Sequence, residues 1–228
     1  MLQLTETNIF ALMDEAHQQG KNIYEKSDFG RRKPWLKQVG KGYHHYIFLK
    51  GSLNIYIVEG QLYQPLTVTR YHDELFPITA KFYLSGASRI KTTNVPGIET
   101  DYIETSGHHY LSYLPELTEV EEWRASLPVQ VVMISADVDY FRMLSSIYGE
   151  LPSPLRRLMQ DARRFHQPMG KMTLAMIQVL KQILQVPYRG PAGHLYLDPK
   201  LRNYWRCSLQ PLMLTQRKTA HHRSKPLI

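Results

Sequence analysis

Residues 43–60 read Tyr-His-His-Tyr-Ile-Phe-Leu-Lys-Gly-Ser-Leu-Asn-Ile-Tyr-Ile-Val-Glu-Gly, and this stretch sets the fold class. It holds two runs of β-branched and aromatic residues, Tyr43–Leu49 and Leu53–Val58, with Gly51 and Ser52 between them. A short glycine-containing turn between such runs is typical of a β-hairpin. We expect two antiparallel strands here, with Gly60 ending the second strand.

Runs of the same kind follow at short intervals, with turn residues such as Ser85 and Gly86 between them. The further predicted strands span residues 62–71, 79–84, 88–92, 98–103, 108–114 and 129–134. Many short strands in close succession favour a β-sandwich or a barrel. One acidic stretch lies among them and is interpreted as a solvated loop or short helix. Its carboxylates are Glu116, Glu119, Glu121 and Glu122.

Helical spacing of apolar residues replaces the strand pattern after residue 136. Asp137 is a candidate N-cap for a first helix, and Ser153 and Pro154 begin a second helix that runs to Phe165. The clearest apolar stripe lies in a third helix, which Pro187 ends. It is made of Met172, Ala175, Met176, Val179, Leu180, Ile183 and Leu184. Such a stripe must be buried, either against the strands or against a second copy of the chain.

Composition limits the class and compartment of the protein. The chain has 228 residues, of which 43% are hydrophobic and 21% charged, as is typical of a globular protein. Cys207 is the one cysteine, and the sequence has no secretory signal and no apolar run of membrane-spanning length. We therefore expect a cytoplasmic protein with no membrane partner.

The net charge of +8 is distributed unevenly. Residues 1–150 hold 14 Lys and Arg against 18 Asp and Glu, whereas residues 151–228 hold 14 against 2. A basic block can bind nucleic acid, although a solvated helix surface and a disordered tail are the more common reason for one.

Histidine pairs are the first place to look for a metal site. His44-His45 and His108-His109 lie on predicted strands, where neighbouring side chains point to opposite faces, so neither pair can chelate one metal with both rings. One member of each pair could still converge with His72. The chain has no His-x-His, Gly-x-Ser-x-Gly, phosphate-loop or dinucleotide motif. We therefore expect no metal, no cofactor and no catalytic residues.

Aromatic residues on the alternating strands are better candidates for a function, because they can line a cavity that holds a small molecule. Simple core packing is the alternative for each of them. The arm before the strands adds cations and an indole, which suit an anionic, aromatic ligand. The candidate ligand contacts are Arg31, Trp35, His45, Tyr46, Tyr56, Tyr83 and Tyr113.

Three stretches resemble the PchR branch of the AraC-family transcription regulators. Leu75–Gly86 resembles a strand that ends in Phe-His-Leu-Ser-Gly, and His108–Pro115 is similar to the block that follows it. The most specific stretch, Val179–Lys200, resembles the family's linker ahead of the DNA-binding part. Together the three reach to about residue 200.

The resemblance implies an α+β fold, with a small cupin-like β-barrel followed by a C-terminal helical dimerisation segment. It implies a small-molecule effector, a ferric siderophore in many members of the branch, and a homodimer. The predicted dimerisation residues are Met172, Met176, Val179, Leu180 and Ile183. The predicted parts are a helix and arm (1–40), the barrel (41–136), the helical segment (137–200) and an atypical, disordered tail (201–228).

The chain departs from the family after Lys200. The resemblance implies a pair of helix-turn-helix units there, which read DNA through the major groove. The residues Leu201–Ser208 do not match, and the chain ends at Ile228. A codon set for Lys200–Cys207, read one nucleotide out of frame, encodes Lys-Ala-Thr-Glu-Leu-Leu-Ala-Leu, which is similar to the family's helix. We therefore expect a frameshifted or truncated regulator.

The leading hypothesis from sequence is an effector-sensing and dimerisation module that is not an enzyme and contacts DNA only through a domain missing from this chain. Two alternatives remain open at this point. One is a metal-dependent cupin-type enzyme, and the other is a small basic DNA-binding protein that acts through its tail.

Overall fold

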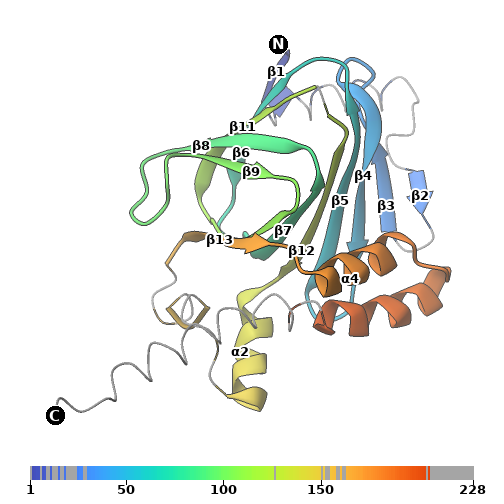
Figure 1. The fold of residues 1–228 in the computed structure, drawn as a ribbon, viewed down its shortest axis with the longest axis vertical. Coiled ribbons are helices and arrows are strands. Elements are labelled where there is room, and N and C mark those ends of the chain that lie inside the picture. The colour runs from blue at the N-terminus through green and yellow to red at the C-terminus, as the bar shows by residue number, and fades with distance from the viewer. Residues whose placement is uncertain are drawn as a thin grey trace.

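Two β-sheets face one another around a cavity in the computed structural model, and helices cover the outside of the larger sheet (Figure 1). The structure describes residues 2–5, 7–8, 11, 15, 18, 25–27, 30–125, 127–149, 151, 155–157, 160, 163–203 and 205. This arrangement confirms a cupin-like β fold with a C-terminal helical segment.

The larger sheet has eight strands, in the order β13-β10-β7-β12-β5-β4-β3-β2. Their bounds are β2 Glu25–Ser27, β3 Gly30–Pro34, β4 Gly40–Phe48, β5 Leu53–Leu62, β7 Ile78–Ser85, β10 His108–Tyr113, β12 Val129–Ala136 and β13 Phe165–Lys171. The predicted hairpin is confirmed as β4 and β5. Both of its turn residues, Gly51 and Ser52, have positive φ angles (77° and 62°), as the turn requires.

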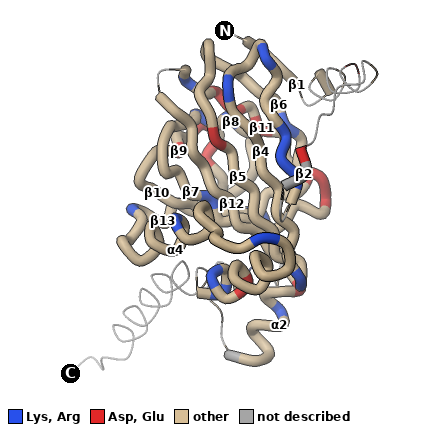
Figure 2. Tube along the Cα trace, turned by 90° about the vertical axis from the view of Figure 1, so that its right-hand side faces the viewer, with Lys and Arg blue, Asp and Glu red and all other residues tan. Residues whose placement is uncertain are grey.

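The smaller sheet has five strands, in the order β1-β6-β11-β8-β9. Their bounds are β1 Leu2–Thr5, β6 Leu66–His72, β8 Ala87–Thr92, β9 Asp101–Thr105 and β11 Leu117–Trp123. All of its pairings are antiparallel except that of β1 with β6. In Figure 2 acidic positions lie along the strands near β8, β9 and β11, and not only in the loops.

The two faces of the eight-stranded sheet differ because alternate residues of a strand point to opposite sides. The outward residues are aliphatic or aromatic and share one core with the helices. From the sheet these include Ile47, Leu53, Ile57, Ile78, Ala80, Phe82, Val132, Ile134 and Ala136. The inward residues face the five-stranded sheet across the cavity.

α2 (Val138–Tyr148) begins where the sequence predicts, and α4 (Leu174–Leu184) begins two residues after the first residue of the predicted stripe, Met172. α2 is capped by Asp137, whose carboxylate accepts from the backbone N–H of Tyr140. α4 is capped in the same way by Thr173. Residues 190–203 form a further helix, which lies near α4 in Figure 1.

The apolar stripe of α4 is buried within the chain itself. Met176, Val179, Leu180 and Ile183 are nearly inaccessible, and the last three belong to the same core as the outer face of the sheet. Met172 packs against this core from the preceding segment. The stripe is therefore buried against the strands of the same chain and not against a second copy. A dimer interface would have to use residues outside this stripe.

Several predicted elements are wrong. The acidic stretch is strand β11, and the predicted arm contributes Gly30–Pro34, which pairs with β4. Gly60 does not end β5 but lies inside it, opposite Gly42. Phe165 begins β13 rather than ending a helix. Pro168 in β13 has no N–H, which disfavours a helix interior but is tolerated on the edge strand that β13 forms.

The two ends of the chain also differ from expectation. β1 joins the smaller sheet, and the described residues 7, 8, 11, 15 and 18 of the predicted N-terminal helix are helical. The apolar residues Ile9, Phe10, Leu12, Met13 and Ala16 of that helix lie outside the described residues. In the predicted tail, residues 201–203 and 205 are helical, and the buried Trp205 ring meets Phe141 of α2 edge-on at 4.9 Å. Residues 206–228 lie outside the described residues.

Candidate functional site

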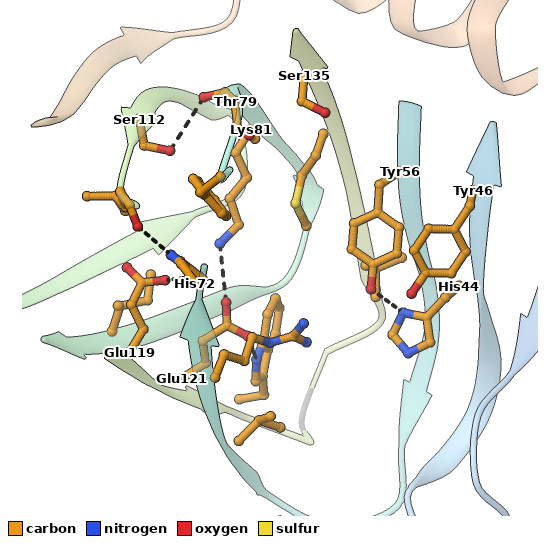
Figure 3. Close-up of a pocket in the computed structure, with 18 of the residues that line it drawn as sticks. His44, Tyr46, Tyr56, His72, Thr79, Lys81, Ser112, Glu119, Glu121 and Ser135 are labelled. Atoms are coloured by element: carbon orange, nitrogen blue, oxygen red, sulfur yellow. Dashed lines mark hydrogen bonds and ion pairs between the residues drawn. The ribbon is translucent and has the colours of Figure 1, made fainter. Parts of the chain in front are cut away.

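A cavity of about 560 Å³ lies between the two sheets. Figure 3 shows that its two sides differ: His44, Tyr46 and Tyr56 stand on the side of β4 and β5, and the ionisable residues stand opposite. We call these the aromatic wall and the charged wall. The volume is within the range of small-molecule sites.

The charged wall is built around Lys81 of β7. Its ammonium group contacts the Glu104 carboxylate of β9 at 2.6 Å and the Glu121 carboxylate of β11 at 3.7 Å. Glu121 also accepts from Arg70 of β6 at 3.1 Å and from the indole N–H of Trp123. Burial would raise the pKa of Glu104, but Lys81 and His166 together outweigh it and lower that pKa to about 2. In the same way Arg70 and Lys81 outweigh burial and lower the pKa of Glu121.

Glu104 has two further partners. The phenol of Tyr83 donates to it at 2.7 Å, and Nε2 of His166 lies 3.0 Å from its other oxygen. His166 is on β13, and its ring stacks on that of Tyr102 with the centroids 4.1 Å apart. Three strands of the smaller sheet (β6, β9 and β11) and two of the larger sheet (β7 and β13) therefore meet at a single buried ion-pair network. Such a network is costly to form unless every charge is paired.

Glu119 behaves differently from its neighbours. It accepts a hydrogen bond from the Tyr102 phenol at 2.9 Å, and Nε2 of His72 lies 3.3 Å from its other oxygen. Burial, together with the charge of Glu121, raises the pKa of Glu119 to about 7, and burial lowers that of His72 to about 4.

The contacts of His72 fix where the proton sits. Its Nδ1 lies 3.1 Å from the carbonyl oxygen of Leu114, which can only accept, so Nδ1 carries the hydrogen. Nε2 of the neutral ring is then an acceptor, and a protonated Glu119 satisfies it. Between about pH 4 and pH 7 the pair is therefore a neutral acid next to a neutral imidazole inside the cavity.

The aromatic wall is neutral. Nδ1 of His44 lies 2.6 Å from the Tyr56 hydroxyl, and the Tyr46 and Tyr56 rings stack with centroids 4.6 Å apart. Burial and the nearby cations Arg70 and Lys33 lower the pKa of His44 to about 3, so its ring is uncharged at neutral pH.

Trp35 completes the aromatic wall from the segment between β3 and β4. Gly42 and Gly60 lie opposite one another in β4 and β5, and a Cβ on either would come within 2.9 Å of the indole ring. The two glycines thus make room for the tryptophan to lie across both strands, which is why Gly60 is needed inside β5 and not at its end.

The chain is similar to a known protein family and to several solved structures. The family model described as the regulatory protein PchR N-terminal domain matches residues 41–201. The chain belongs to this family of AraC-type regulatory domains. The matched range contains the residues that line the cavity except Leu4 of β1 and the lining residues between Lys33 and Val39. No curated protein sequence matches the chain.

This PchR-type domain is also similar to solved structures. The AraC-like transcriptional activator CuxR has 8% identity and a TM-score of 0.48, over 76% of this chain and 56% of that chain. A mutant of Bacillus subtilis oxalate decarboxylase, OxdC, has 10% identity and a TM-score of 0.36, over 56% of this chain and 36% of that chain. The domain therefore spans only about a third to a half of the length of these chains.

The candidate ligand contacts of the PchR-type domain fall into two groups. Trp35, Tyr46 and Tyr56 line the cavity. Their role in binding stays a prediction.

The other four do not line the cavity. Arg31 is exposed on β3. His45 and Tyr113 alternate with the inward residues of their strands, so their side chains lie on the outer face of the sheet. Tyr113 belongs to the core beneath the helices. Tyr83 points inward but does not line the cavity: its ring packs against Trp123 and Tyr110, and it contacts the lining residues Glu104 and Lys81.

The whole charged wall was missed from sequence. In β11, Leu117, Glu119, Glu121 and Trp123 alternate with outward residues, and this period of two was the available signal. Among the described residues, no group of three His, Cys, Asp or Glu could hold a metal ion. No helix in the described part of the chain is long and apolar enough to cross a membrane.

Proposed function

We propose that this chain is the effector-sensing portion of an AraC-type transcription regulator and that the effector binds in the cavity between the two sheets. The observation that supports this most is the buried charged wall. An ion-pair network of this kind contributes less stability than apolar packing of the same volume, so its presence at a cavity points to binding.

The effector that the family resemblance favours is a ferric siderophore, and the same resemblance favours a homodimer. DNA would be read only through a further domain that is not part of this chain. In this proposal the protein is not an enzyme: the ionisable groups hold and orient a ligand without transforming it. The expected compartment is the cytoplasm.

The path from ligand to helices is short. His166 lines the cavity and contacts Glu104, and β13, which carries it, leads through Thr173 directly into α4. The backbone N–H of Met172, at this junction, donates to the carbonyl oxygen of Gly107 next to β10. A ligand that displaced His166 from Glu104 would therefore act on the strand that positions α4.

A thermal-shift screen with ferric chelates and phenolic acids tests the proposal, because a ligand that binds only the native state raises its apparent stability. A ligand at about 100 times its Kd adds about 2.7 kcal/mol, or roughly 5–10 °C in a chain of this size. Ser135→Leu, which places a larger side chain on the cavity lining, should abolish the shift, whereas Thr93→Leu on an exposed loop should keep it.

Two outcomes would contradict the proposal. One is a screen in which no compound raises the melting temperature of the wild-type protein, although Ser135→Leu folds and melts at the same temperature as the wild type. The other is stoichiometric iron, nickel or zinc in the purified protein together with turnover of a substrate, which would support the metal-dependent enzyme instead.

A further inference from the structure

We infer that Lys33 is the anion-binding residue of the cavity and that the ligand is a small organic anion, with a carboxylate or similar compact negative group beside Lys33 and an apolar body against the aromatic wall. This rests on the proposed function and names the ligand class for the same site.

Lys33 differs from the other cations that line the cavity. Arg70 is paired with Glu121 at 3.1 Å, and Lys81 is paired with Glu104 at 2.6 Å. Lys33 is half-buried on β3 and lines the cavity, yet within the described part of the chain no carboxylate lies in ion-pair contact with it.

The surroundings of Lys33 add positive charge instead of cancelling it. Burial lowers the pKa of the Lys33 ammonium group most, and the positive charge of Arg70 lowers it further. Both cations also lower the pKa of His44, which lies directly opposite Lys33 in the pairing of β3 with β4. Lys33 is therefore a partly desolvated cation beside the Glu121-paired Arg70, with no carboxylate of its own among the described residues, and a bound anion would remove the cost of that arrangement.

His44 adds a neutral donor to the same place. Burial raises the pKa of the Tyr56 phenol, and the hydrogen bonds of Tyr46 and Arg70 to its oxygen oppose this rise; the guanidinium of Arg70 can only donate. The phenol therefore uses its own hydrogen for Nδ1 of His44, 2.6 Å away. This leaves the hydrogen of the neutral imidazole on Nε2, as a donor that an anion can use.

The rest of the lining near Lys33 is apolar. The next residues along the chain, Trp35, Leu36 and Val39, line the cavity, as do Leu62 and Val68 from β5 and β6. A fully hydrated inorganic ion would gain nothing from these surfaces. An anion with a flat or branched hydrocarbon body would gain from both parts of the site.

The test compares 2-naphthoate with the uncharged 2-naphthamide by calorimetric titration into the wild-type protein, Lys33→Met and Lys41→Met. Lys41 is an exposed lysine on β4 and serves as the matched control. We expect the wild type and Lys41→Met to prefer the carboxylate over the amide. Lys33→Met should lose about tenfold or more in carboxylate affinity and keep its affinity for the amide.

A second measurement separates binding from folding. Because Lys33 is a half-buried cation with no carboxylate in ion-pair contact among the described residues, Lys33→Met should raise the melting temperature of the ligand-free protein, and the loss of a merely structural lysine would lower it. The inference is overturned if Lys33→Met lowers that temperature, or if it binds the carboxylate as tightly as the wild type does. It is also overturned if only uncharged or cationic probes bind to the wild type. In that case the proposed function stands, because a ligand still binds in the protein. If no probe binds, including ferric chelates, the proposed function fails as well.

Discussion

The two faces of the eight-stranded sheet come from the same strands but have opposite chemistry. On β7, Ile78, Ala80 and Phe82 point outward into the core beneath the helices, while Thr79 and Lys81 between them point into the cavity. The outer face has the composition that stability requires. The inner face carries charges, phenols and imidazoles that a stable core does not need, and this difference separates the part of the sheet that holds the fold from the part that can bind.

The largest effect should come from breaking the inner network at its centre. Lys81→Met leaves Glu104 and Glu121 buried without their shared cation, and we expect a loss of about 3–5 kcal/mol in the free energy of unfolding. Urea denaturation measures it. The double variant Lys81→Met/Glu104→Gln should recover much of the loss, because it removes a charge from each side. No recovery would mean that the network is not electrostatically coupled.

Removing hydrocarbon from the outer face should cost nearly as much. Leu180 on α4 is completely buried against the sheet, and Leu180→Ala should reduce the free energy of unfolding by about 2–5 kcal/mol. Leu174→Ala, at an 80% exposed position of the same helix, is the control and should change it by less than about 0.5 kcal/mol. Equal effects at the two sites would show that α4 does not pack on the sheet as described.

A smaller effect, but one with a definite sign, should appear in the pH dependence at Glu119. Its folded-state pKa of about 7 lies above the ordinary value of 4.5, so the folded protein holds the extra proton between those values. Its contribution to stability is therefore present below pH 4.5 and is lost as the pH rises through 7.

Glu119→Gln imitates the protonated acid, because an amide can donate to His72 and accept from Tyr102. We expect the variant to gain about 1–3 kcal/mol relative to the wild type between pH 5 and pH 8. Thermal unfolding across this range measures the gain. Glu122→Gln, on the outer side of the same strand, should show no such trend, and a flat profile for Glu119→Gln would contradict the protonation state described here.

The smallest effect should come from an exposed ion pair in the smaller sheet, away from both faces of the eight-stranded sheet. Arg89 and Asp101 form a well-aligned ion pair between β8 and β9, but both are exposed to water. Water and salt screen an exposed ion pair, and forming it costs side-chain entropy. We therefore expect Arg89→Ala to leave the melting temperature unchanged within error. A clear loss would show that buried and exposed charges of the smaller sheet are coupled.

Much of the outer face could be predicted from the sequence. The hairpin at 43–60, the cap at Asp137 and the stripe of α4 follow from local patterns, because apolar burial and capping leave a period or a residue type that a sequence displays. The partner of the stripe did not follow, since burial against the barrel and burial against a second chain demand the same residues.

The inner face was largely hidden. Glu119 and Glu121 have the composition of a solvated loop, and only the three-dimensional positions of Lys81, Arg70 and Tyr102, brought from distant strands, make their burial tolerable. Tyr113 was misplaced because a tyrosine suits either face of a strand. Lys33 looked like part of a polar arm, because the pairing that carries it into the cavity wall is set by β4.

A crystal structure of the protein with the strongest stabilising ligand tests the central claim most directly. The account predicts one molecule per chain between the two sheets, touching the aromatic wall and the charged wall and lying beside Lys33. Ligand density on the helices or in a contact between chains, with the space between the sheets unchanged, would contradict it.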